Sequence, residues 1–144
     1  MTEETVRPDG ANDRCVIVVD EALPVGRAAN AAAVVALTIG RRHPGLVGDD
    51  LVDAGGGYHP GLIPIGISVL AATAADLVAV RGKALARGID VVDFPTAGQE
   101  TTDYAAFGDA VARTPAGDLG YVAVGLVGAR REVGKVVGRL PLLR

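Results

Sequence analysis

Residues 15–41 read CVIVVDEALPVGRAANAAAVVALTIGR, and this stretch decides the fold. An apolar run of four residues is followed by Asp20, by a short loop and by an alanine-rich segment that is apolar on nearly every face. Such a pattern predicts a buried strand followed by a helix buried at the centre of the domain. We therefore expect a strand over residues 14–20 and a helix over residues 26–41, with Gly40 as its stop signal.

The rest of the chain alternates between helix and strand patterns. Residues 43–61 are rich in glycine, proline and aspartate, which predicts a loop with one short strand and a glycine turn. Residues 63–71 are rich in β-branched residues but contain Pro64 and Gly66, which predicts an edge strand or one bent at its start. The later elements are expected, in chain order, as helix 73–87, strand 89–94, helix 103–113, strand 119–127 and helix 129–139.

This order of elements predicts a single α/β domain. We expect a three-layer α/β/α sandwich with a mixed, mostly parallel sheet, because the strands that flank helix 73–87 should be joined by a right-handed crossover. A chain of 144 residues can bury roughly two thirds of its unfolded surface, enough for one core. The domain is expected over residues 14–144, after a disordered tail at residues 1–13, which are polar and acidic.

Composition narrows the location and the partners. No apolar run reaches the ~18 residues of a membrane span, and the first residues lack the pattern of a signal peptide, so a cytoplasmic protein is expected. The net charge of −3 argues against a protein whose whole surface binds nucleic acid. A basic stripe formed by Arg131, Lys135 and Arg139 on the last helix could still bind RNA or a smaller anion, or could be an ordinary solvated face.

Cofactor and metal motifs are missing from the sequence. No GxGxxG follows the first strand and no GxxxxGK[ST] occurs, so no nucleotide cofactor is expected. Two histidines, one cysteine and no carboxylates at ligand spacing do not predict a metal site. Cys15 is expected to be a packed core residue, with a reactive thiol as the alternative.

Polar residues beside the predicted strands are the candidates for a site. Asp20 and Asp93 each follow an apolar run, and on neighbouring strands their carboxylates could share a proton, although strand-end aspartates also cap turns. Asn30 lies one turn into an apolar helix, where an unpartnered amide would cost ~1–3 kcal/mol, so it should bind a neighbouring element or a ligand. Arg27 in the first turn could bind an anion or be solvated. His59 follows three glycines and could belong to a mobile lid or to a solvated loop.

Three motifs carry a family resemblance. They are VIVVDEALPVGRAANAAAV at residues 16–34, DFPTAGQ at residues 93–99 and YVAVGLVGARREVGKVVGRLPLL at residues 121–143. Together they resemble the small uncharacterised family known as domain of unknown function 2000, over about residues 14–143. That family is similar to the type II peptidyl-tRNA hydrolases of archaea and eukaryotes, so the resemblance implies their fold.

The resemblance to the hydrolases also implies site positions. The hydrolases carry a lysine ahead of an alanine–alanine–glutamine run, and aligning Asn30 with that glutamine places Gly26 at the lysine. Aligning Gly98 with the glycine of their alanine–glycine pair places Thr96 at their aspartate. Lys135 begins KVVG, which matches their last motif except for its threonine. Two residues that the hydrolase chemistry needs are therefore replaced.

Two functions remain open at this stage. The first is a protein that binds a small or anionic ligand at the N-terminus of helix 26–41, and the second is a hydrolase of aminoacyl or peptidyl esters with a replaced catalytic set. The candidate catalytic residues are Asp20, Asp93 and Thr96. The candidate ligand-binding residues are Gly26, Arg27, Asn30, His59, Gly98, Gln99 and Lys135.

A homodimer is also expected. The similar hydrolases are commonly dimers, and 49% of this chain is hydrophobic. Gly134 and Gly138, four residues apart in the last helix, would let another helix or a second subunit approach the backbone closely.

Overall fold

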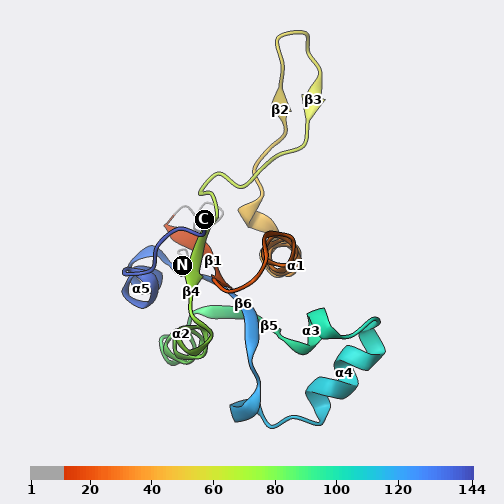
Figure 1. The fold of residues 1–144 in the computed structure, drawn as a ribbon. Helices are drawn as coiled ribbons and strands as arrows, with labels where there is room; N and C mark the ends of the chain where they lie inside the picture. Colours follow the sequence, from red (N-terminus) through yellow and green to blue (C-terminus); the bar gives the residue numbers. More distant parts are fainter. Residues whose placement is uncertain (1–11) are drawn as a thin grey trace, which may run out of the picture.

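The computed structural model describes residues 12–144, which form three layers (Figure 1). A four-stranded sheet in the order β4-β1-β6-β5 has α1 on one face and α2 with α5 on the other. The strands are β1 (Asp13–Asp20), β4 (Ser68–Ala72), β5 (Asp90–Pro95) and β6 (Tyr121–Ala129). The three packed helices are α1 (Val25–Arg42), α2 (Ala74–Ala86) and α5 (Arg130–Val137). The predicted α/β fold with a mixed sheet is confirmed.

The expectation of a mostly parallel sheet is wrong. β1 and β4 are parallel, but β6 pairs antiparallel with both β1 and β5. The strands that flank α2, β4 and β5, run in the same direction but form opposite edges of the sheet. The last strand of the chain enters the middle of the sheet between β1 and β5, and no local sequence pattern reports such an insertion.

The remaining elements are short and lie around this sandwich. They are η2 (Pro44–Leu46), β2 (Leu51–Val52), β3 (Tyr58–His59), α3 (Ala97–Glu100), α4 (Tyr104–Ala112) and η3 (Ala116–Asp118). The segment predicted as a loop with one short strand contains a hairpin of two strands, because β3 pairs with β2. The short helix α3 was not predicted. The expected edge position of β4 is confirmed. Thr73 caps α2 by accepting a hydrogen bond from Asp76 N–H. Gly88 follows α2 with a φ of 72°, a left-handed conformation that commonly ends helices.

The chain ahead of the domain is only partly described. Residues 1–11, which fall in the predicted disordered tail, lie outside the described residues. Asp13 belongs to β1, where it pairs with Ala129, so the sheet begins one residue earlier than expected. No helix within residues 12–144 has both the length and the apolar character needed to cross a membrane.

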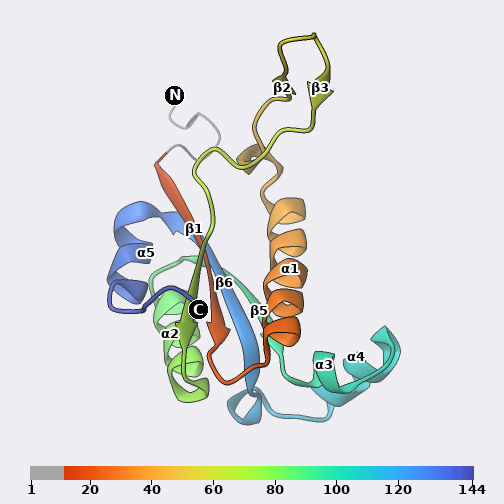
Figure 2. The same cartoon turned by 45° about the horizontal axis from the view of Figure 1, so that its top comes forward.

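α1 is buried on one face only, contrary to the prediction of a helix buried all round. Its buried residues recur every three or four positions and are Ala28, Ala31, Val35 and Ile39. Its opposite face leaves Val34 42% and Leu37 79% exposed. The sheet covers one side of α1, and no other layer formed by residues 12–144 covers the opposite side, so these apolar side chains meet solvent (Figure 2). The helix also continues through Gly40 to Arg42, so Gly40 is not its end.

α1 lies close to β6 because Gly125 has no side chain. A Cβ atom at this position would lie 2.5 Å from Val35 Cγ1 and 2.9 Å from Ile39 Cδ1. Gly125 stands between Ile17 of β1 and Val92 of β5 in the sheet, so α1 packs into a depression bordered by larger side chains. This contact sets the distance between α1 and the sheet.

Substitution of Gly125 tests this packing. Gly125→Ala should lower the free energy of unfolding by roughly 1–3 kcal/mol, because the added methyl group displaces Val35 and Ile39. Gly82→Ala is the matched control: Gly82 is exposed within α2 with open space around it, and alanine there should raise stability by about 1 kcal/mol. Urea unfolding of both variants measures the difference, and a Gly125→Ala protein as stable as wild type would refute the close packing.

Candidate functional site

The N-terminus of α1 has unsatisfied backbone donors. Pro24 is the N-cap and offers no side-chain acceptor, and the first turn has no acidic residue. Ala28 N–H donates to the Pro24 carbonyl at 2.9 Å, whereas the preceding N–H groups of Val25, Gly26 and Arg27 have no acceptor within the helix. These groups and the positive end of the helix dipole favour an anion.

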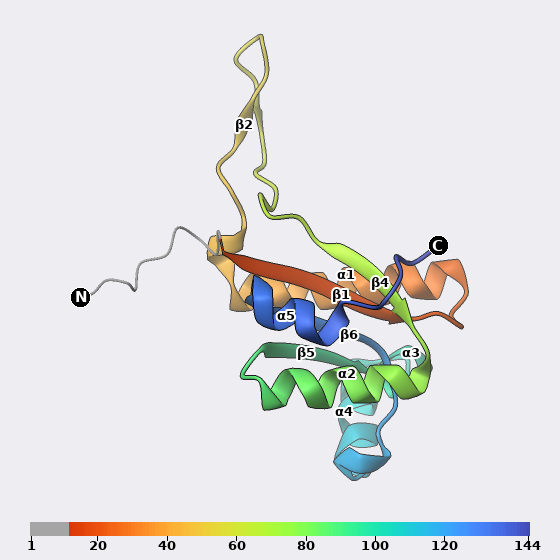
Figure 3. The same ribbon diagram turned by 90° about the vertical axis from the view of Figure 1, so that its left-hand side faces the viewer.

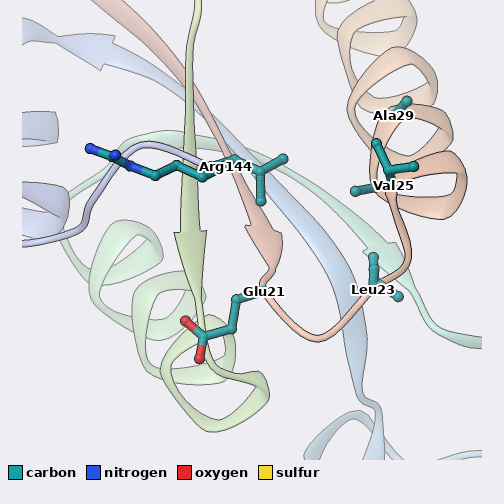
Figure 4. A pocket seen from close by; sticks show the side chains of 7 residues that line it. Glu21, Leu23, Val25, Ala29 and Arg144 are labelled. Atoms are coloured by element: carbon teal, nitrogen blue, oxygen red, sulfur yellow. The ribbon is translucent and has the colours of Figure 1, made fainter.

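A cavity of about 230 Å³ adjoins this first turn (Figure 4). It is lined by Glu21, Leu23, Val25, Ala28, Ala29, Leu143 and Arg144. Leu23, Val25 and Ala29 form one apolar wall, and the side chains of Glu21 and Arg144 extend away from that wall (Figure 4). The cavity therefore has an apolar interior with charged groups at its edge, and Val25, the first residue of α1, lies in its lining.

The other side of the same helical turn is attached to α3. Gln99 Nε2 donates to the Arg27 carbonyl at 2.9 Å and to Asn30 Oδ1 at 3.1 Å. Because the Arg27 carbonyl can only accept, the amide nitrogen of Gln99 must face α1. Arg27 and Asn30 lie about 140–160° around the helix from Val25, so they do not line the cavity. Asn30 thus has a neighbouring partner, one of the two alternatives predicted, although it is exposed and so does not pay the burial cost on which the prediction rested.

Gly98 and Thr96 build the turn that presents Gln99. A Cβ atom on Gly98 would collide with the Phe94 ring and would come within 3.1 Å of Phe107, so only glycine allows this packing. Thr96 N–H donates to the Gly120 carbonyl at 2.9 Å, and the Thr96 carbonyl accepts from Gln99 N–H at 3.1 Å. The oxygen Oε1 of Gln99 is buried and accepts no hydrogen bond from the described residues.

The two predicted carboxylates do not form a pair. Asp20 ends β1 and accepts a hydrogen bond from Ala22 N–H at 2.9 Å, so it caps a turn. Asp93 lies on β5, which β6 separates from β1, and it accepts from Arg81 Nε at 2.7 Å. The Arg81 guanidinium also lies 5.2 Å from the centre of the Tyr121 ring. The condition for shared-proton chemistry, neighbouring strands, is not met.

His59 and Lys135 lie away from the N-terminus of α1. His59 is on β3 of the projecting hairpin, with Nε2 2.8 Å from Asp53 Oδ2. Lys135 is on α5, which covers the opposite face of the sheet from α1, and its Nζ is 3.5 Å from Glu132 Oε2. α5 ends at Val137, so Arg139 of the predicted basic stripe lies beyond the helix.

Sequence reasoning missed a charged cluster at the C-terminal end of α1. Arg42 donates to both carboxylate oxygens of Asp90, at 2.9 and 2.7 Å, and His43 Nε2 lies 2.6 Å from the same carboxylate. The hydrogen bonds from Arg42 and His43 outweigh the opposing effect of burial and hold the pKa of Asp90 at about 2. Arg42 and Asp90 are 48 residues apart, and no spacing pattern connects them.

The cavity wall was missed because its alanine, valine and leucine residues resemble ordinary core residues.

The single cysteine is part of the core. Cys15 is 1% exposed, and burial raises the pKa of its thiol to about 11. The packed state is therefore favoured over a reactive thiolate.

Within residues 12–144, no three His, Cys, Asp or Glu side chains are grouped as metal ligands would be.

These features define a small three-layer α/β protein with a cavity beside the uncapped N-terminus of its first helix. The chain belongs to the family of proteins of unknown function DUF2000, whose family model matches residues 13–144. Among solved structures, the chain is similar to a protein of unknown function from Agrobacterium tumefaciens. The TM-score is 0.82 at 19% identity, covering 91% of this chain and 97% of that chain, which shows a shared fold. No curated protein matches the sequence.

The Asp90 cluster predicts a pH-dependent contribution to stability. The pKa of Asp90 is lower in the folded state, at about 2, than in an unfolded chain, at roughly 3.9. Its contribution is therefore fully present above about pH 4 and is lost as the pH falls toward 2. Asp90→Asn should reduce stability by about 1–2 kcal/mol at neutral pH. Denaturation from pH 2 to 7 measures the gap between variant and wild type, and a gap that does not shrink below pH 4 would contradict this assignment.

Proposed function

We propose that the protein binds a small anion with a short apolar part, such as an aliphatic carboxylate, at the N-terminus of α1. The observation that carries this proposal is that Val25, the first residue of α1, belongs both to the uncapped first turn and to the lining of the cavity. The first turn of α1 has free N–H groups and no capping side chain, and its residues Val25, Ala28 and Ala29 also form part of an apolar cavity wall. A carboxylate would accept from the N–H groups while its apolar chain fills the cavity.

The size and charge of the cavity restrict the ligand. Its volume of about 230 Å³ is below the roughly 300–1,000 Å³ of pockets for drug-sized molecules, so the ligand is small. Glu21 and Arg144 carry opposite charges at the edge away from Val25, so we assign the anionic group to the helix end on the basis of its free N–H groups. Gln99 supports the site from behind, because its hydrogen bonds to Arg27 and Asn30 fix the first turn.

Hydrolysis of aminoacyl or peptidyl esters is the less supported alternative. Asp20 and Asp93 are each engaged with a different partner and lie on strands separated by β6. Thr96 follows Asp93 on the same segment and contributes its backbone to the α3 turn. The relation to type II peptidyl-tRNA hydrolases and the cytoplasmic location both rest on the sequence alone.

Binding of simple carboxylates tests the proposed function. Hexanoate should bind more tightly than acetate, which lacks the apolar chain, and more tightly than hexanamide, which lacks the charge. Amide chemical-shift changes should centre on residues 25–29 in a ¹⁵N-labelled sample. Equal responses to hexanoate and hexanamide, or no response around α1, would refute the proposal.

Two pairs of variants separate the contributions of the head group and the chain. Gly26→Asp should weaken hexanoate binding much more than the isosteric Gly26→Asn, because only aspartate supplies a competing anion, and the space around Gly26 is open. Ala29→Leu should block the apolar chain by filling the cavity. Ala33→Leu, one turn further along the exposed face, is the control and should leave binding unchanged.

A direct assay addresses the hydrolase alternative. We expect no substantial cleavage of peptidyl-tRNA, because Gly26 and Thr96 occupy the positions at which the hydrolases carry their lysine and aspartate. Incubation of the purified chain with labelled peptidyl-tRNA, beside an authentic type II hydrolase, measures this. Turnover comparable with that enzyme would make hydrolysis the better-supported function.

A further inference from the structure

Residues 47–62 form an arm that projects from the C-terminal end of α1 beyond the rest of the molecule. The arm follows η2 and contains β2 and β3, and it extends away from the sheet and the helices in every view (Figures 1 and 3). Its exposed apolar side chains are Val47 (51%), Leu51 (56%), Val52 (59%), Tyr58 (74%) and Leu62 (71%). An isolated two-stranded hairpin is only marginally stable in water, so this element needs a covering partner.

The arm is nevertheless built with specific hydrogen bonds. Asp53 Oδ1 accepts from the N–H groups of Gly55 and Gly57, both at 2.9 Å, and Asp53 Oδ2 lies 2.8 Å from His59 Nε2. At the base of the arm, the two chain segments approach so closely that a Cβ atom on Gly61 would collide with the Gly48 carbonyl. The arm is thus a defined structure whose apolar side chains remain in solvent.

The outer face of α1 has the complementary properties. A shallow depression of about 660 Å³ is lined by Leu37, Thr38, Arg41 and Arg42, and Leu37 is 79% exposed. Arg41 makes no ion pair with residues 12–144. The arm contains Asp49, Asp50 and Asp53 and no lysine or arginine. Asp50 and Asp53 already accept hydrogen bonds within the arm. Because Arg42 already binds Asp90, Asp49 and Arg41 remain as the complementary charges of the arm and the helix surface.

We infer that the arm of one copy docks on the outer face of α1 in a second copy, forming a homodimer. The depression lies in the last turns of α1, directly before the chain enters η2 and the arm. The two complementary surfaces therefore lie near each other on one chain, and a two-fold axis beside this end of α1 lets each arm reach the partner. Such an interface is self-complementary and closes after two copies.

Sedimentation of the full chain tests the assembly. At micromolar concentration the wild type should sediment as a species of twice 14.6 kDa. Leu37→Asp should raise the dimer dissociation constant at least about tenfold, because it places a charge at the centre of the interface. Leu85→Asp on α2, where the leucine is 50% exposed, is the matched control and should leave the dimer intact. Circular dichroism confirms that both variants are folded.

A charge exchange identifies the surfaces that meet. Arg41→Asp should weaken the dimer, and adding Asp49→Lys to the same chain should restore it, because Asp49 is exposed and makes no side-chain hydrogen bond among the described residues. A mixture of Leu37→Cys and Tyr58→Cys proteins should form an intermolecular disulfide, whereas Leu37→Cys with Tyr104→Cys should not, although Tyr104 is 87% exposed.

Three results would overturn the inference. They are a wild type that stays monomeric at every concentration, a Leu37→Asp dimer as tight as wild type, and a disulfide from Tyr104→Cys without one from Tyr58→Cys. A monomeric wild type would leave the arm to a different kind of partner. None of these results affects carboxylate binding at the other end of α1, so the two proposals fail separately.

Discussion

The contact of α1 with β6 over Gly125 is the constraint on which the other features depend. With no side chain at Gly125, Val35 and Ile39 approach the sheet closely enough to fix the height of α1. The position of α1 then places its N-terminus beside the end of β1 and its C-terminus beside the start of β5. Both the cavity and the charged cluster therefore depend on where α1 lies on the sheet.

β5 and the turn that follows it hold α1 at both ends. At the N-terminal end, Gln99 binds Arg27 and Asn30, and at the C-terminal end Asp90 binds Arg42 together with His43. These contacts hold α1 in place, and the N–H groups of its first turn have no acceptor within the helix. Its free N–H groups and its outer apolar face consequently remain available at fixed positions, as binding surfaces require.

The sequence predicts local structure well and long-range pairing poorly. The strand 14–20, the helix after it and the cap of α2 at Thr73 all follow from periodicity and capping chemistry. The burial expected for Asn30 was wrong, because only one face of α1 is buried, and its partner Gln99 could not be identified because it is 69 residues away. The pairing of Asp20 with Asp93 failed for a related reason: it depended on strand order, and β6 enters between their strands from the end of the chain.

The arm shows why packing in the interior does not account for the whole molecule. The buried residues form one cluster on each face of the sheet, so the fold of the domain needs no contact with a second chain. The arm adds nothing to either core, yet its turn is organised by three contacts to one carboxylate, Asp53. Hydrogen bonds that order a segment reduce the entropy lost when that segment binds a partner. Because the arm is ordered, apolar and remote from the core, its role lies in the surface that it offers to a partner.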